Sequence, residues 1–214
     1  MKTRPGRNVG LASSLGLLLG AVIALIALSG VVGRADEQAI RWDIITLTPG
    51  PAVNAGGVAS AKATNAAGTE TSTITVTGSG TFEVPEGSEK KDDVTGGGMW
   101  TISTGAITTF GTYKVTGVVR WTEAPGTAGF LDNIANGADK RAGLAVLRIK
   151  YSDGDLGILV VSCTLGGTPP TVFEGITATK GFTDYWKAQA PTGGPTGPNA
   201  NRTLFHVVHE DEDD

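Results

Sequence analysis

The chain repeats one pattern three times, as VTGSGTF at residues 76–82, VTGGGMW at 94–100 and VTGVVRW at 115–121. Each copy has Val-Thr-Gly, three variable residues and a large aromatic residue. Gly, Thr and Val at this density oppose a helix. In a strand, residues two apart share a face, so each copy places a β-branched residue, a small gap and a ring together. A ring from a neighbouring strand can lie over such a gap, as in sharply coiled sheets and small barrels.

The spacing of the copies favours a meander. They start 18 and then 21 residues apart, which is one hairpin per interval and too short for a propeller blade of about 40 residues. We therefore expect neighbouring antiparallel strands. In the third copy the alternation predicts that Val115, Gly117, Val119 and Trp121 share one face.

The clearest hairpin signal lies at residues 144–165, LAVLRIKY-SDGD-LGILVVSCTL. The first strand alternates, and the inward positions are Ala145, Leu147, Ile149 and Tyr151. Asp-Gly in the turn is a strong hairpin signal. The return strand is almost continuously apolar, which predicts a central strand covered on both faces. Cys163 falls on its inward side, so we expect a buried, inert thiol.

Other segments complete an all-β pattern. RWDIITLT at 41–48 predicts an early strand, TDYWKAQA at 183–190 one helical turn, and RTLFHVV at 202–208 a last strand that returns beside an early one. Strands with turns every 8–12 residues are typical of sandwiches and barrels. We expect a single antiparallel barrel or sandwich of about 8–10 strands over residues 36–208, with an acidic tail at 209–214.

The N-terminal segment has the pattern of a secretory signal. Lys2, Arg4 and Arg7 precede an uncharged run from Asn8 to Gly33. A basic start, an apolar centre and a small-residue cleavage site predict a signal peptide over residues 1–35 and a secreted, extracellular domain. The alternative is a retained membrane anchor, since about 20 apolar residues span a bilayer.

Composition excludes several partners. Removing residues 1–35 takes away four basic and no acidic residues, which leaves 13 basic against 21 acidic side chains. Nucleic acids need a basic face, so we expect no nucleic-acid partner, and a membrane partner only if the segment stays as an anchor.

One cysteine excludes an intrachain disulfide and a Cys-rich zinc site. A chain of this length can bury about 70% of its unfolded surface without such staples.

Two stretches carry a family resemblance: residues 143–186, from GLAVLRIKY to GFTDYW, and NRTLFHVV at 201–208. They resemble secreted all-β proteins of bacterial type that have no assigned activity. The resemblance covers the C-terminal half and implies no functional residue.

No motif for hydrolysis, nucleotide binding or metalloproteolysis is present in the sequence, and no cofactor is indicated. Glu174 and Asp184 are the best candidates for a paired acid and base, with Lys180, Tyr185 and Trp186 near them in sequence. The competing interpretation is cross-strand pairing with a ring over the sheet end.

Metal binding is a weaker hypothesis. His206 and His209 precede acidic residues, but an odd offset in a strand puts them on opposite faces, which favours a solvated tail. Asp153 and Asp155 are too few oxygens for a calcium loop, and a turn is the better interpretation.

The leading functional hypothesis is a secreted, non-catalytic surface, structural or small-apolar-ligand binding module. A ligand inside a barrel would contact Phe82, Trp100 and Trp121, with Phe130 as part of a lid formed by the long loop at 122–143. The alternative is a barrel enzyme, either a cyclase or isomerase, or a hydrolase that uses Glu174 and Asp184. If the rings fill the core instead, another surface component is the expected partner.

Overall fold

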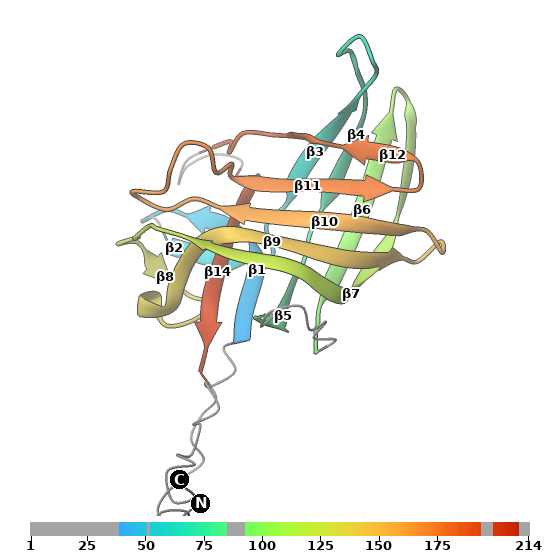
Figure 1. The fold of residues 1–214 in the computed structure, drawn as a ribbon. Helices are drawn as coiled ribbons and strands as arrows, with labels where there is room; N and C mark the ends of the chain where they lie inside the picture. Colours follow the sequence, from blue (N-terminus) through green and yellow to red (C-terminus); the bar gives the residue numbers. More distant parts are fainter. Residues whose placement is uncertain (1–38, 51, 85–92, 194–198, 210–214) are drawn as a thin grey trace, which may run out of the picture. The chain divides into compact units, whose positions relative to one another are not determined.

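The computed structural model describes residues 39–50, 52–84, 93–193 and 199–209, all within one compact unit (Figure 1). The predicted signal segment at 1–35 and the acidic residues at 210–214 lie outside the described residues. The described part contains no α-helix and consists mainly of strands. The elements are β1 Ala39–Thr48, β2 Ala52–Ala55, β3 Ala59–Thr64, β4 Glu70–Val76, β5 Ser79–Glu83, β6 Gly97–Thr104, β7 Ile107–Ala124, β8 Leu131–Asp132, a 3-10 turn η1 Gly137–Asp139, β9 Lys140–Tyr151, β10 Leu156–Cys163, β11 Gly175–Lys180, β12 Thr183–Tyr185, β13 Lys187–Ala188 and β14 Arg202–Val208.

Six strands close an antiparallel barrel in the order β9-β14-β1-β5-β6-β7, with β7 paired back onto β9. The last strand, β14, lies between β1 and β9, which confirms that the chain end returns beside an early strand. Strands β10, β11 and β12 extend outward from β9, and β4 and β3 extend from β6. The predicted all-β antiparallel fold is therefore confirmed, as a barrel with outer strands.

The first two sequence copies pair with each other in register. Val76 is opposite Trp100, Ser79 opposite Gly97 and Phe82 opposite Val94. The first copy joins two strands that have different second partners: β4 pairs with β3, whereas β5 pairs with β1. The glycines lie at this corner. Gly96 has a φ of 104°, and a Cβ there would lie 2.2 Å from the carbonyl oxygen of Ser79, so only glycine allows the two backbones to approach.

The third copy departs from the predicted alternation. Register shifts between Val115 and Gly117 and between Val118 and Arg120 mark β-bulges in β7. Val118 is buried and Val119 is exposed, so the expectation that Val119 shares the inward face is wrong. A bulge adds one residue to a strand and reverses the faces beyond it. The alternation is restored at Trp121, whose ring packs against Phe205 at a centroid distance of 4.6 Å.

Rings from neighbouring strands lie over glycines both inside and outside the repeats. In the first copy, a Cβ at Gly78 would lie 2.3 Å from the hydroxyl oxygen of Tyr113 and 3.2 Å from the ring of Trp42. A Cβ at Gly143 would lie 2.5 Å from the ring of Trp121, and one at Gly111 would lie 2.9 Å from the indole nitrogen of Trp100. These contacts seat bulky rings against β9 and β7.

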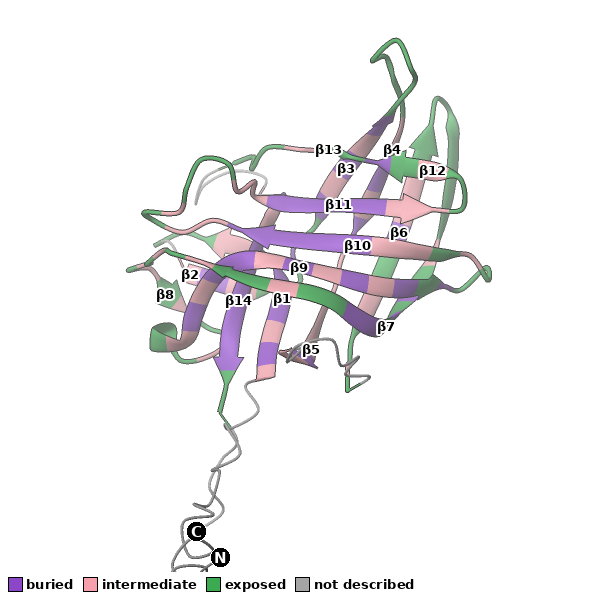
Figure 2. Cartoon of the chain, viewed as in Figure 1, coloured by how far each residue is buried: buried purple, intermediate pink, exposed green. Residues whose placement is uncertain are grey.

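The hairpin of β9 and β10 follows the prediction. Ala145, Leu147, Ile149 and Tyr151 are buried, and β10 lies between β9 and β11 (Figure 2). Cys163 is fully buried and unpaired. Burial, followed by the nearby Glu174 carboxylate, raises the pKa of its thiol well above the ordinary value, which fits an inert cysteine.

Of two expectations about irregular segments, one is wrong and the other gives bounds that are too wide. Residues 183–190 do not form a helical turn, because β12 pairs with β11 and β13 pairs with β3, and these ladders satisfy the backbone. The loop expected at 122–143 is shorter than predicted, since β7 continues to Ala124 and β9 begins at Lys140. The connection at residues 125–139 contains β8 and η1, and β8 pairs with β2, which in turn pairs with β1.

Side chains fill the barrel interior. Trp42, Phe82 and Phe205 are buried, and the ring of Trp121 contacts Phe82 at 5.8 Å and Phe205 at 4.6 Å between centroids. The long buried stretches lie on β1, β14 and β9 of the barrel wall and continue onto β10 and β11 beyond β9 (Figure 2). The core is therefore packed with rings and aliphatic side chains, as small barrels usually are.

Candidate functional site

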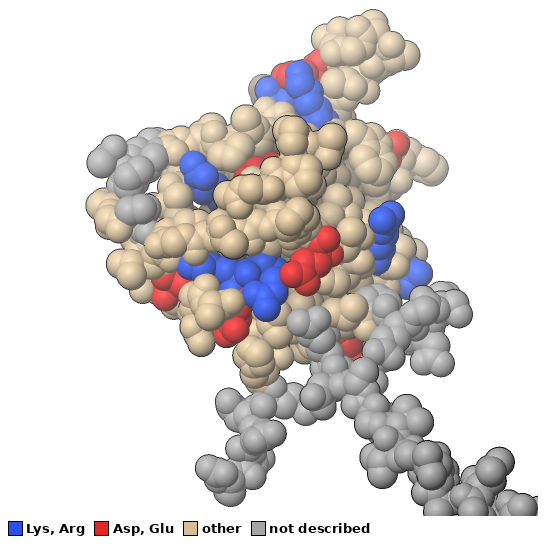
Figure 3. Space-filling model, turned by 60° about the vertical axis from the view of Figure 1, so that its left-hand side comes forward, with Lys and Arg blue, Asp and Glu red and all other residues tan. Residues whose placement is uncertain are grey.

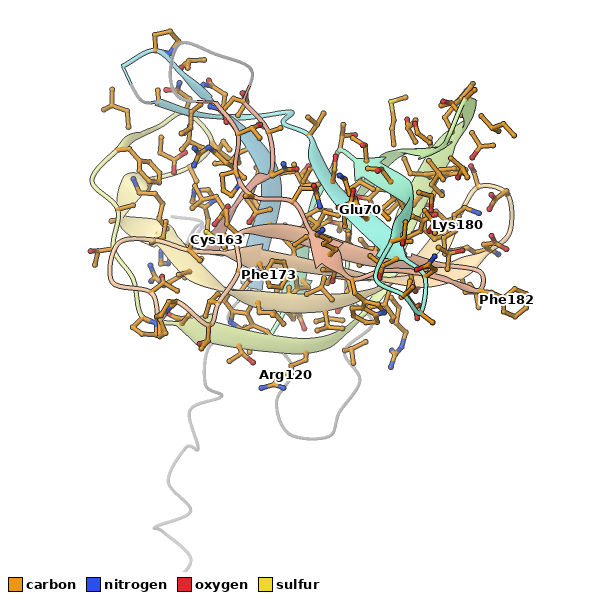
Figure 4. The ribbon with its side chains drawn as sticks, turned by 90° about the horizontal axis from the view of Figure 1, so that it is seen from above. Glu70, Arg120, Cys163, Phe173, Lys180 and Phe182 are labelled. Atoms are coloured by element: carbon orange, nitrogen blue, oxygen red, sulfur yellow. The ribbon has the colours of Figure 1, made fainter. Side chains whose placement is uncertain are left out.

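A small cavity lies at one end of the barrel, where β10 ends and β14 begins. Its volume is about 100 Å³. Figure 4 shows Cys163 and Phe173 toward this end, away from Lys180 and Phe182. The lining residues are Ile45, Leu47, Phe130, Thr164, Leu165, Glu174, Pro191, Arg202 and Thr203. The wall is mainly apolar, with one carboxyl group and one guanidinium group.

Glu174 is held by neutral donors. Its Oε2 accepts from the backbone N–H of Thr164 at 2.6 Å and from the Thr164 hydroxyl at 2.9 Å. Its Oε1 accepts from the backbone N–H of Thr203 at 2.7 Å, while the Thr203 hydroxyl donates to the carbonyl of Ser162 at 2.6 Å. Burial raises the pKa of Glu174, although these hydrogen bonds oppose the shift. The carboxyl group thus joins the ends of three strands, β10, β11 and β14.

Arg202 does not neutralise Glu174. Its Nε donates to Asn199 Oδ1 at 3.1 Å, and its terminal nitrogen donates to the carbonyl of Gly193 at 3.2 Å. Among the described residues no ion pair joins Arg202 to Glu174. The guanidinium therefore fixes the segment before β14.

A second buried polar group lies close by, beneath the segment that carries β8. His206 Nε2 lies 2.7 Å from Asp132 Oδ2, and both side chains are 1% exposed. Asp132 Oδ1 also accepts from the backbone N–H groups of Ile134 and Ala135. Burial alone would raise the pKa of Asp132, but the hydrogen bonds from His206 and from this backbone lower it below the ordinary value.

Cations flank His206 on both neighbouring strands. Arg41 on β1 and Lys140 on β9 are its cross-strand partners. Arg41 donates to both oxygens of the fully buried Asp43, at 2.8 and 3.0 Å. Lys140 donates to the carbonyl oxygen of Phe130 at 2.6 Å and lies 4.4 Å from the centre of that ring. These contacts fasten the β8 segment to the barrel.

Sequence reasoning missed this cluster. Asp132 and His206 are 74 residues apart, and no local pattern joins them. A usable signal was present: His206 lies within an apolar strand pattern, and Arg41 and Asp43 lie two apart in another, so buried polar groups on paired strands could have been expected. His206 and His209 have different surroundings: His206 on β14 is buried, whereas His209 lies beyond the end of β14 and is exposed beside Asp139.

The predicted acid and base do not meet. Asp184 is opposite Thr179 on β11, five residues beyond Glu174, which corresponds to about 16 Å along an extended chain. Lys180 follows Thr179 on β11, farther from Glu174, and is bound at 2.5 Å by both Asp153 and Asp155. The structure therefore separates Glu174 from Asp184.

The remaining candidates have structural surroundings. Lys180 lies 4.8 Å from the ring centre of Trp100 and 5.0 Å from that of Tyr151, and closes the far end of the barrel. Phe82 and Trp100 are buried, and Trp121 is partly buried and packs against the core. Phe130 alone of the four proposed ligand contacts lines the cavity. In the described part of the chain, no cluster of three or more His, Cys, Asp or Glu side chains has the arrangement of a metal site.

Charges on the surface are mixed. On the face shown in Figure 3, Lys and Arg side chains lie beside Asp and Glu. Arg141 pairs with Glu123 at 3.4 Å, and Glu70 binds Lys187 and Lys62 elsewhere on the surface. Hydrogen bonds from Lys187 and Lys62 lower the pKa of Glu70 to about 2.

Comparison of the chain with protein-family models, with curated proteins and with solved structures finds no match. Within the described ranges, no helix has the length and apolar character needed to cross a bilayer.

Proposed function

We propose that this chain is an exported, non-catalytic binding module that acts through its outer surface. The observation that carries the proposal is the filled barrel interior, where Trp42, Phe82 and Phe205 are buried and Trp121 packs against Phe82 and Phe205. A carrier of a small apolar ligand needs an enclosed space instead. The barrel-end cavity of about 100 Å³ is well below the roughly 300 Å³ at which ligand sites begin.

A methyl-NMR ligand screen tests this proposal. Isotope-labelled methyl groups of Ile40, Ile44 and Leu147, all fully buried, would be observed while short-chain fatty acids, terpenoid alcohols and sterols are added in turn. We expect these interior resonances to stay unchanged. Saturable shifts of the interior methyl groups would show that a ligand enters the barrel and would overturn the proposal in favour of ligand carriage.

Export is the second part of the proposal, and it is supported by the basic start and long uncharged run at residues 1–35. Expression in a bacterial host with a functional secretory pathway should give a mature chain that begins near Asp36. Mass spectrometry of the exported fraction checks this. Intact Met1 on protein in the cytosolic fraction would refute export, and intact Met1 in the membrane fraction would indicate the retained anchor.

One observation favours the enzyme alternative: a carboxyl group of raised pKa stands in the wall of an apolar cavity, an arrangement that acid catalysts use. Its oxygens are nevertheless taken up by Thr164 and Thr203. If Glu174 were a catalytic acid, Glu174→Gln would abolish turnover of a substrate found by screening and leave the melting temperature unchanged. If the role of Glu174 is structural, we expect Glu174→Gln to lower the melting temperature clearly.

A further inference from the structure

The first residues of β7 form a free sheet edge. β7 pairs with β6 from Ile107 onward, but its pairing with β9 begins only at Tyr113. Ser152 directly follows β9, and its amide still donates to the carbonyl of Thr112 at 2.8 Å before the chain turns toward β10. Residues 107–111 therefore have a neighbouring strand on one side alone in the described part of the chain. Figure 1 shows the β6–β7 hairpin rising above β10 at the right of the domain.

The unpaired backbone groups of this edge belong to Thr108 and Phe110. In an antiparallel strand the N–H and C=O groups of alternate residues point to opposite sides. Those of Thr112 point to Ser152, whose hydroxyl also accepts from the Thr112 N–H at 3.1 Å. The groups of Thr108 and Phe110 point to the same side, where no strand of the described residues meets them. Two donors and two acceptors are therefore open to a further strand.

This edge lacks the features that usually protect one. Natural edge strands carry lysine, proline or a bulge, which prevent another strand from pairing. Residues 107–111 read ITTFG, and no charged residue occurs from 94 to 113. The bulges of β7 lie at 115–120, beyond the free edge. Ile107 and Phe110 are 69% and 75% exposed, so the edge offers apolar side chains together with its hydrogen-bonding groups, as sites of strand addition do.

We propose that residues 107–111, the β7 edge, pair with the β7 edge of a second copy of this chain, in an antiparallel ladder about a two-fold axis at Thr109. This register uses all five residues. Thr108 lies opposite the partner's Phe110 and exchanges two hydrogen bonds with it, and the two-fold axis doubles these to four. Thr109 lies opposite its own copy, and Ile107 lies opposite Gly111, which has no side chain to obstruct it.

A second copy fits this edge in charge and in side-chain pairing. Without residues 1–35 the chain has 13 basic and 21 acidic side chains, so two copies repel each other over most of their surfaces. The uncharged run at 94–113 brings no like charges together. Thr–Thr and aromatic–β-branched pairs across strands are favourable, and the proposed register forms both. The inference rests on the proposed surface function and names a second copy as the partner.

Cysteine cross-linking in the full chain tests this pairing. In Thr109→Cys the thiol meets its own copy, since opposite Cα atoms of a non-hydrogen-bonded pair lie about 4.5 Å apart, within reach of a disulfide. Thr108→Cys is the matched control: Thr108 is also exposed, but its copy lies two positions along the partner strand, more than about 7 Å away and too far for a disulfide. Cys163 is fully buried and should not react in the native protein. Both variants are oxidised mildly, and their dimers are measured on denaturing, non-reducing gels.

We expect Thr109→Cys to form a disulfide-linked dimer, and Thr108→Cys to give a dimer yield at least tenfold lower. Adding Thr108→Pro to Thr109→Cys should slow cross-linking by tenfold or more. Proline removes the outward N–H and leaves the bonds to β6 intact, so the two-fold axis makes two of the four bonds disappear. Circular dichroism of the proline variant checks that the sheet is retained.

Three results would overturn the proposal. Equal dimer yields at 108 and 109 would show contact without this register, such as association through residues 1–35. No dimer at 109 would show that a second copy does not bind there, and a disulfide from 109 to a different protein would show that the edge serves another partner. The surface function is tested separately by the interior methyl groups, since ligand entry would refute it whatever the cross-linking shows.

Discussion

Two buried carboxyl groups near the same barrel end respond to burial in opposite ways. Glu174 accepts hydrogen bonds from Thr164 and Thr203, which are neutral, and its pKa is raised. Asp132 accepts from His206 as well as from backbone, and its pKa is lowered. Both groups lose water, so the loss of water alone does not decide the outcome. The difference lies in whether an ionisable partner stands opposite.

The comparison also separates two kinds of fastening. Glu174 joins strand ends of the barrel itself, whereas Asp132 fastens the β8 segment onto β14. A group held by neutral donors should tolerate loss of its charge better than loss of its oxygens. A group held by a histidine should be more costly to remove, because the partner is left buried without an acceptor.

The largest effect is expected for Asp132→Ala. It leaves His206, 1% exposed, without its partner, and breaking a buried pair of this kind costs about 3 kcal/mol. Urea unfolding followed by tryptophan fluorescence measures the loss. Asp132→Asn keeps an acceptor for the imidazole and should lose less. Equal stability of the alanine variant and the parent would show that the pair contributes nothing to folding.

Glu174→Ala should come next, at about 2 kcal/mol, because the N–H groups of Thr164 and Thr203 lose their acceptor. Glu174→Gln keeps one oxygen and should cost roughly half as much. Glu70→Gln is the control, since Glu70 is an exposed carboxylate bound by two lysines, and it should change stability least. The comparison fails if Glu174→Gln is as damaging as Glu174→Ala.

The pH dependence of stability should differ in sign between the two sites. The folded pKa of Glu174 is raised, so its contribution is present at low pH and is lost as pH rises through that raised value. The folded pKa of Asp132 is lowered, so its contribution is present above the ordinary value and is lost as pH falls through the lowered one. Thermal melts of the parent and of the Gln and Asn variants across this range should therefore diverge in opposite directions. Parallel curves would contradict the assigned partners.

An effect smaller than that of Asp132→Ala or Glu174→Ala is expected at the far end of the barrel. Lys180 is 10% exposed, but its partners Asp153 and Asp155 are 44% and 46% exposed, so solvent screens the ion pairs. Lys180→Met should cost only about 1 kcal/mol of stability, because part of the contact with the rings of Trp100 and Tyr151 remains. This loss of stability should become smaller with added salt, since salt screens the ion pairs that the change removes. A loss as large as that of Asp132→Ala would show that this end behaves as a buried site.

Local patterns in the sequence predict the strands of this domain well and its buried polar sites poorly. Alternation around Ala145 and Leu147, with Asp-Gly in the turn, identifies the β9–β10 hairpin, and the apolar pattern before His206 identifies β14. The bulges in β7 are set by its pairing with β9, so Val119 could not be placed from alternation. Asp132 and His206 meet only because β14 returns beside β1 and β9, and no spacing along the chain encodes that contact.

The central claim is that the buried carboxyl groups of Glu174 and Asp132 serve the fold, each held by its own partners. The most direct measurement is a carbon-13 NMR titration of the side-chain carboxyl carbons in the folded protein. Glu174 should titrate above the ordinary value of a glutamate, and Asp132 below that of an aspartate. A Glu174 midpoint at the ordinary value, in protein that remains folded, would contradict the claim, because the carboxyl group would then be solvated in an open site.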